Sequence, residues 1–268
     1  MNDINPQCPR CGAPDSDRGR GNGRGMGRGM GGRGMGGGMG GGGRGMGSSG
    51  FGPGAGTPPA AGLGMPGAGF ADVDRTAHRA AHVAQIRADI AAAPRGVLSA
   101  EELDDLLLMR EEEKIARDVY IRMYEQWGMR PFGNISGAEQ AHMDAMLALL
   151  EHYGEPDPAR GLGVGQFRRT DLQALHDDLV GKGLQSPAEA VRVGLLIEEL
   201  DIADLQKAAR RTDKPEIRAV YAELERGSRN HLRAFHRWMQ MLGIDYQPQH
   251  LSAAEFERTA LSAHETCA

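Results

Sequence analysis

Four segments far apart in the chain each place an acidic or histidine side chain within an otherwise apolar helical stripe. These side chains are Glu113, Glu139 with His142, Glu198, and His231. Residues three or four positions apart share one face of a helix, so all of them fall on faces that a helical protein buries. Carboxylates and imidazoles are costly to bury unless they are paired or bind a metal. The sequence therefore favours a helical fold that gathers these groups at one point.

Helix caps and apolar periodicity place the helices along the chain. An Ala-rich leading helix is expected within residues 71–96, four long helices within residues 97–250, and a C-terminal tail over residues 251–268. The four long helices are predicted over about residues 99–127, 131–153, 186–211 and 213–243, with a short helix over 171–181. The connection between the second and third long helices is much longer than the others. This order predicts an all-α fold, the ferritin-like variant of a four-helix bundle.

The predicted helix ends depend on a few residues. Ser99 and Glu102 form a capping-box pair before the first long helix, and Gly128 follows its end. Pro131 suits the first turn of the second long helix, and Ser186 precedes another proline at the start of the third.

The N-terminal part of the chain differs from the helical part in composition. Residues 1–16 form a short head that contains Cys8 and Cys11. Residues 17–70 are dominated by Gly with interspersed Arg and Met, and then become rich in Pro, Ala and Gly. Such a segment cannot bury enough apolar surface to offset its ordering entropy, so we expect it to be disordered.

Charge and composition exclude several classes of protein. The formal net charge is -5, although arginines are the only charged residues between Arg18 and Gly47. The remainder is therefore more acidic than the total, which argues against a basic nucleic-acid-binding body. No run approaches the roughly 18 apolar residues that suggest a membrane span. The three cysteines form no disulfide framework and the N-terminus lacks the pattern of a secretory signal, so a cytoplasmic location is expected.

The first and third long helices each offer more than one candidate ligand. In the first, Glu113 is preferred and Glu112 is the alternative, because consecutive glutamates cannot all avoid the apolar stripe. In the third, Glu198 lies near the middle of the apolar arc, with Glu199 as a weaker alternative. Asp201, one turn later, either adds a second carboxylate or forms a hydrogen bond with a ligand histidine.

The second and fourth long helices have unbroken stripes. Glu139 and His142 occupy consecutive core positions, a Glu-x-x-His spacing that lets both side chains reach one ion. Ser136 and Glu139 also match a capping box, which would begin the helix at Gly137, but the stripe continues upstream and favours an earlier start. A lone core histidine is usually structural, yet His231 accompanies other core histidine and carboxylate groups. We therefore interpret it as a ligand.

These motifs resemble those of a known superfamily. Over about residues 97–250, the segments MREEEKIARDVY, FGNISGAEQAHMDAM, LIEELDIADL and ERGSRNHLRAF resemble the ferritin-like di-iron carboxylate proteins, in particular the rubrerythrin branch. They are most similar to a bacterial and archaeal ferritin-like family of unassigned role, the domain of unknown function 2202. The four motifs together are specific, although any one alone would be weak.

The resemblance implies a site, a cofactor and an activity. It implies metal ligands at Glu113, Glu139, His142 and Glu198, with Tyr120 near the metals. There Tyr120 would tune a ligand by hydrogen bonding or relay an electron, and its alternative role is ordinary core packing. The implied cofactor is two Fe, with Mn or Zn as alternatives. The implied activity is an oxidoreductase of ferroxidase or peroxidase type acting on oxygen, peroxide or Fe(II), and such bundles often form homodimers.

The fourth helix departs from the superfamily pattern. The superfamily usually carries a second Glu-x-x-His there, whereas this chain has Ser228 three residues before His231. Either Asp201 replaces the missing carboxylate from the third helix, or the second metal position is weak, water-rich or empty. The competing hypothesis is a bundle that stores or senses a metal without turnover.

The two ends of the chain carry weaker signals. Cys8 and Cys11 form one knuckle of a zinc ribbon or rubredoxin, and one knuckle supplies only two of four ligands. His264 and Cys267 could complete a structural zinc site, or two chains could share one; a free dithiol is the alternative. A built-in rubredoxin-type electron donor needs a second knuckle, which the chain lacks.

The Gly-, Arg- and Met-rich segment is expected to be a flexible tether. Weak binding to RNA through its arginines, which would make this an interaction protein, is not favoured because no aromatic residues are interleaved with them. Cu(I) binding by its methionines is a further alternative. His78 and His82, spaced four residues apart on the leading helix, are interpreted as surface residues rather than a metal site.

Overall fold

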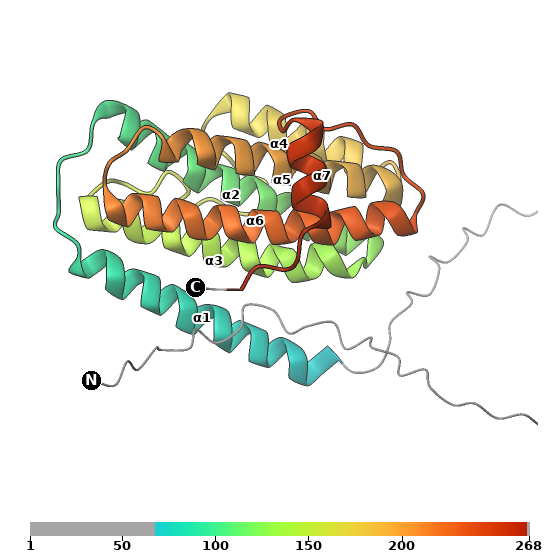
Figure 1. The fold of residues 1–268 in the computed structure, drawn as a ribbon, viewed down its shortest axis with the longest axis horizontal. Coiled ribbons are helices and arrows are strands. Elements are labelled where there is room, and N and C mark those ends of the chain that lie inside the picture. The colour runs from blue at the N-terminus through green and yellow to red at the C-terminus, as the bar shows by residue number, and fades with distance from the viewer. Residues whose placement is uncertain (1–67, 267–268) are drawn as a thin grey trace, which may run out of the picture. The chain divides into compact units, whose positions relative to one another are not determined.

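The computed structural model of this chain describes residues 68–266, with side chains described from residue 75 onward. The expectations for Cys8, Cys11 and Cys267, and for nearly all of the Gly-rich segment, lie outside the described residues. Within them the fold is all-α, as predicted, and has no strand. Its seven helices (Figure 1) are α1 (Ala68–Ala92), α2 (Ala100–Trp127), α3 (Arg130–Tyr153), α4 (Thr170–Gly183), α5 (Pro187–Ala209), α6 (Pro215–Met241) and α7 (Ala253–Leu261).

The helices begin and end at the residues that the sequence singled out. Ser99 caps α2 in a capping box with Glu102, and Gly128 ends that helix with a φ of 62°. Pro131 lies in the first turn of α3, and the Ser186 side chain accepts a hydrogen bond from the backbone N–H of Glu189 at the start of α5. These devices satisfy backbone groups that a helix end leaves without partners. The predicted bounds of the long helices are therefore close to the observed ones.

The C-terminal residues contain a helix that the sequence analysis did not predict. Ser252 caps α7, its side chain accepting the backbone N–H of Glu255. The short α7 packs on α6, with Phe256 and Ala260 buried. α7 has only nine residues, which is too short for its apolar periodicity to distinguish a helix from a tail in the sequence.

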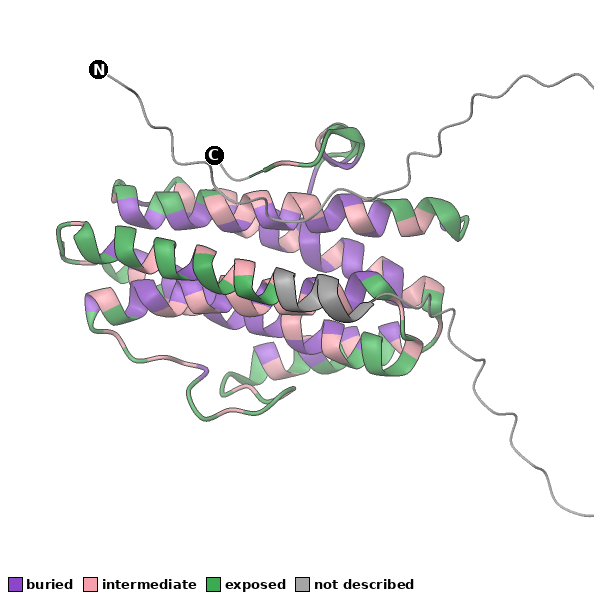
Figure 2. Cartoon of the chain, turned by 90° about the horizontal axis from the view of Figure 1, so that it is seen from below, coloured by how far each residue is buried: buried purple, intermediate pink, exposed green. Residues whose placement is uncertain are grey.

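Four long helices enclose the interior. α2 packs along α3, α5 packs along α6, and the two pairs meet through α2 with α5 and α3 with α6. α1 packs on α3 and α6, whereas α4 packs on α2 and α5 (Figure 1). The buried faces of the long helices turn toward one another and the exposed faces point outward (Figure 2). No helix among residues 68–266 is long and apolar enough to cross a membrane.

Two apolar clusters fill the interior and leave a polar level between them. On α2, Met109 belongs to one cluster and Tyr120 to the other, so Glu113 lies between them. Glu139 on α3 and His231 on α6 likewise fall between residues of the two clusters. The polar side chains of the four helices are thus held at one height within an otherwise apolar core.

Candidate metal centre

Five of the predicted ligands come together at this polar level. They are supplied by all four long helices: Glu113 by α2, Glu139 and His142 by α3, Glu198 by α5, and His231 by α6. Each of the three glutamates is only 1% exposed, and the His231 side chain is 11% exposed. Burial of several ionisable groups at one point is costly, so their arrangement requires a physical reason.

The five residues form two donor groups that share one carboxylate. One group is Glu113, Glu139 and His142, and the other is Glu139, Glu198 and His231; the ligand atoms within each lie within 4.8 Å of one another. Glu139 Oε2 lies 2.8 Å from His142 Nδ1, and Glu139 Oε1 lies 2.9 Å from His231 Nδ1. Glu139 therefore turns one oxygen toward each histidine, the arrangement of a bridging carboxylate.

The outer glutamates complete the two groups in a nearly symmetric way. Glu113 Oε2 lies 3.1 Å from His142 Nδ1, and Glu198 Oε2 lies 3.4 Å from His231 Nδ1. The two imidazole rings stack with centroids 5.5 Å apart and an angle of 28° between their planes. Each half of the centre thus offers one histidine nitrogen, one glutamate of its own and one oxygen of Glu139.

In the half of the centre that contains His231, the orientation of the donors fits a metal better than mutual hydrogen bonding. Glu139 Oε1 and His231 Nδ1 are 2.9 Å apart, yet neither atom has a hydrogen-bond partner. Glu113 Oε1 is also buried without a partner. Two ligands that each lie about 2.0–2.2 Å from one ion are about 3 Å apart, as these donors are. Mixed imidazole and carboxylate donors suit iron, manganese or zinc.

Comparisons with known proteins agree with this picture of the fold. Residues 102–263 match the family described as "Uncharacterized protein domain (DUF2202)". The chain belongs to this family. Uncharacterized protein MJ0754 of Methanocaldococcus jannaschii is 45% identical over 176 residues, which are 66% of this chain and 95% of that relative. The crystal structure of hypothetical protein MJ0754 from Methanococcus jannaschii matches with a TM-score of 0.63 at 45% identity, covering 65% of this chain and 99% of that one.

The electrostatics of the DUF2202 centre show an excess of buried negative charge. Burial raises the pKa of Glu113 to about 7 and the pKa of Glu198 to about 6. Burial alone would lower the pKa of His231, but Glu139 and Glu198 raise it to about 9. Burial likewise opposes ionisation of Glu139, yet His231 and His142 hold its pKa below the ordinary value. A divalent cation would supply the positive charge that two histidines provide only in part.

Asp201 lies beside the centre without joining either donor group. It is 8% exposed, and its Oδ2 accepts a hydrogen bond from the hydroxyl of the fully buried Ser228. Burial and the nearby Glu113 and Glu198 raise the pKa of Asp201. Ser228, which stands where the superfamily usually has a glutamate, therefore donates to the carboxylate that was considered as a replacement for that glutamate. The sequence placed both residues in the core but could not show that they face each other, because this depends on how α5 and α6 align.

The alternative glutamates have other positions. Glu199 accepts hydrogen bonds from the backbone N–H groups of Gln249, His250 and Leu251, and so fixes the segment that leads to α7. Glu112 is half-buried, has an unpartnered oxygen and belongs to neither donor group.

Two other sequence interpretations can be compared with local contacts. The Ser136 hydroxyl donates to Gly133 O within α3, so the alternative helix start at Gly137 is wrong. On α1, His82 Nε2 lies 2.7 Å from Glu223 Oε1, and His78 belongs to no metal-type group among residues 75–266.

Tyr120 contacts the centre from its apolar side. Its hydroxyl donates a 2.6 Å hydrogen bond to Glu198 Oε1, and the side chain is fully buried. Its ring packs against Phe132 and Phe235 at centroid distances of 5.8 and 5.3 Å. Tyr120 thus donates a hydrogen bond to a candidate ligand and also fills the core.

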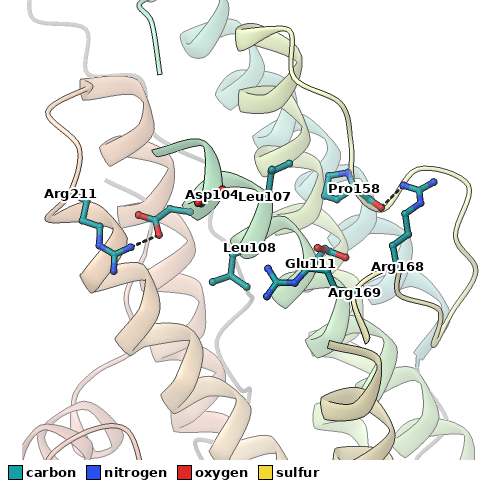
Figure 3. A pocket seen from close by; sticks show the side chains of 9 residues that line it. Asp104, Leu107, Leu108, Glu111, Pro158, Arg168, Arg169 and Arg211 are labelled. Atoms are coloured by element: carbon teal, nitrogen blue, oxygen red, sulfur yellow. Dashed lines mark hydrogen bonds and ion pairs between the residues drawn. The ribbon is translucent and has the colours of Figure 1, made fainter. Parts of the chain in front are cut away.

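A surface pocket of about 520 Å³ lies elsewhere, along α2 and the connection that precedes α4 (Figure 3). Its walls include Glu111, which is 2% exposed and has an unpartnered oxygen, and Arg169. Arg211, at the edge of the pocket, bonds with Asp105. None of the five donors lines this pocket, so it is separate from the candidate metal centre.

Proposed function

We propose that this DUF2202 protein is a ferritin-like di-metal oxidoreductase, related in kind to the rubrerythrins, that holds two iron ions. Its substrates are oxygen, peroxide or Fe(II), and manganese or zinc are the alternative metals. The observation that carries the proposal is that Glu139 belongs to both donor groups, each of which has its own histidine and glutamate. A shared carboxylate keeps two ions about 3.5–4 Å apart, close enough to act on one small molecule.

The order of the helices supports the ferritin-like assignment. Ferritin-like bundles have one long crossover connection between their two helix pairs. In this chain the segment between α3 and α5 is the long one, and it contains α4. The proposal also includes a cytoplasmic setting, which rests on the low cysteine content of the sequence.

The chain's own residues would hold the ions and exclude water. Glu139 would bridge, Glu113 with His142 would hold one position, and Glu198 with His231 would hold the other. With iron bound, the centre would supply electron transfer to oxygen or peroxide. Tyr120, through its hydrogen bond to Glu198, would fix the orientation of that carboxylate while its ring keeps the adjoining space apolar.

Anaerobic titration of the full chain with Fe(II) tests the proposal directly. We expect two equivalents per chain to bind, and exposure to oxygen or peroxide to oxidise them over several turnovers when a reductant is supplied. Glu139→Gln should abolish tight binding of both equivalents, because that residue is common to the two groups. Glu111→Gln is the matched control, since it removes a charge from an equally buried glutamate of α2 outside both groups. Absence of metal binding by the wild-type protein would contradict the proposal.

The contact between Ser228 and Asp201 favours a second candidate function, a metal-storing or metal-sensing bundle without turnover. Ser228 stands where the superfamily usually has the glutamate of a second Glu-x-x-His, so the centre has one carboxylate fewer. Metal binding with no consumption of oxygen or peroxide in the presence of a reductant would favour this function. Sustained consumption that Glu139→Gln removes would favour the oxidoreductase.

A further inference from the structure

Gly227 lies in the middle of α6, where it faces the imidazole of His142 on α3. We propose that Gly227 is a positioning residue for the metal centre: its missing side chain provides the space in which His142 turns Nδ1 toward Glu113 and Glu139. The inference rests on the proposed function and adds to it a residue outside the donor groups. Gly227 precedes Ser228 and was not singled out by the sequence motifs.

The space beside Gly227 is filled by the histidine ring. A Cβ added at this glycine would lie 2.6 Å from His142 Cε1 and closer still to Nε2. Real Cβ atoms do not approach other atoms so closely, and the ring has little freedom to move. On its opposite edge His142 Nδ1 is held by carboxylate oxygens 2.8 and 3.1 Å away. The imidazole is therefore fixed between the α6 backbone and the donor group.

Backbone conformation does not explain the glycine. Gly227 has ordinary helical backbone angles, unlike Gly128 and Gly154, whose positive φ values end their helices. Glycine within a helix costs about 0.5–1 kcal/mol relative to alanine. The chain accepts this cost at a buried position where the three nearest atoms to an added Cβ all belong to His142. Close approach of the ring is thus the property that requires glycine here.

Gly227 acts on one half of the centre only. His142 belongs to the donor group with Glu113, whereas His231, one turn after Gly227, belongs to the group with Glu198. Displacement of the His142 ring should therefore weaken one metal position and leave the other. A residue with a merely structural role would not separate the two positions in this way.

Titration of Gly227→Ala with Fe(II) under anaerobic conditions tests this separation. We expect one equivalent to bind as in the wild type and the other to bind about 10- to 100-fold more weakly, as when a contact that orients a ligand is lost. Gly181→Ala is one control, because nothing lies within 4 Å of its added Cβ. Gly183→Ala is the other, because its Cβ would contact Met123 Sδ at 2.5 Å, and neither residue belongs to a donor group. Both controls should retain two equivalents.

If Gly227→Ala folds poorly, a double-mutant cycle of unfolding free energies still tests the contact with His142. Urea unfolding of the metal-free protein would compare Gly227→Ala in the wild type and in His142→Ala, which removes the ring. We expect the alanine to destabilise only the chain that retains the ring. An equal effect in both backgrounds, or two unaltered metal equivalents in Gly227→Ala, would overturn the inference. Failure of the wild type to bind metal would instead contradict the proposed function, while the cycle would still report the contact.

Discussion

Glu199 and Glu113 are both almost fully buried carboxylates on long helices, yet their surroundings differ. Glu199 accepts hydrogen bonds from three backbone N–H groups of the segment before α7. Glu113 has an unpartnered oxygen and lies in a group with a second carboxylate, that of Glu139. Each carboxylate leaves one oxygen without a partner, but the other oxygen of Glu199 accepts from three backbone N–H groups, whereas that of Glu113 contacts the His142 imidazole.

The same difference separates two sets of carboxylates in the described part of the chain. The structural carboxylates, Glu102, Asp118 and Glu199, each have several donors among lysines, hydroxyls or backbone N–H groups. The central carboxylates are Glu113, Glu139, Glu198 and Asp201, which lie near one another with two histidines. Donors within the protein stabilise the structural carboxylates, whereas under the proposed function a bound cation would supply the positive charge that the central carboxylates lack.

The largest expected effect follows from removing the partner of a structural carboxylate. Lys114 is 1% exposed, bonds with the fully buried Asp118 and with Gly163 O, and lies over the ring of Phe167. Lys114→Met would leave the buried Asp118 with Arg117 in place of two cationic partners, and would remove the donor to Gly163 O. We expect the free energy of unfolding in urea to fall by about 3–5 kcal/mol, with the metal equivalents unchanged.

A surface pair with the same sequence spacing is the control for that variant. Lys182 and Asp178 are four residues apart and 2.6 Å from each other, but both side chains are more than half exposed. Lys182→Met should cost less than about 1 kcal/mol, because exposed pairs contribute little. If Lys114→Met cost no more than this control, Asp118 would not be a structural carboxylate in the sense used here.

A smaller loss is expected for Glu199→Gln, which keeps the shape of the side chain and removes its charge. The amide oxygen would still accept from the three backbone N–H groups, but these hydrogen bonds would become neutral, and the NH2 group would take the place of the oxygen that has no partner. We expect the unfolding free energy to fall by about 1.5–3 kcal/mol. Glu189→Gln on the same helix, where the side chain is 36% exposed, should have little effect. Loss of a metal equivalent in Glu199→Gln would show that Glu199 belongs with the central carboxylates.

The sequence predicted the helices and the donors well because both depend on local signals. Capping residues such as Ser99 and Gly128 mark helix ends, and the three- and four-residue spacing of Glu139 and His142 places both on a buried face. The role of Glu199 was not predictable, because its partners come from a loop without periodicity. The contact of Gly227 with His142 depends on how closely two helices pack, which no single helix shows.

The next prediction concerns pH and the structural carboxylate Glu102. Although burial opposes its ionisation, Lys214 and Thr212 lower the pKa of Glu102 to about 2. Since the folded pKa is depressed, its stabilising contribution is complete above the unfolded value of 4.5 and is lost as the pH falls toward 2. We expect the unfolding free energy of Glu102→Gln to depend less on pH in this range than that of the wild type. The loss should be smaller than for Glu199→Gln, because the Lys214 side chain is 17% exposed. An unchanged acid slope, measured by urea unfolding between these pH values, would contradict the assignment.

The smallest expected effect has the opposite sign and belongs to a central carboxylate. Glu113→Gln removes one charge from the buried group that Glu113 forms with Glu139, while an amide oxygen remains to accept from His142. In the presence of a chelator we expect the unfolding free energy to rise by about 0.5–1 kcal/mol, because buried carboxylates that are kept together for function destabilise the metal-free fold. With Fe(II) present the order should reverse, since only the wild type gains the binding energy of both ions. A chelator-independent loss like that of Glu199→Gln would place Glu113 among the structural carboxylates, and the distinction between the two sets would fail at its centre.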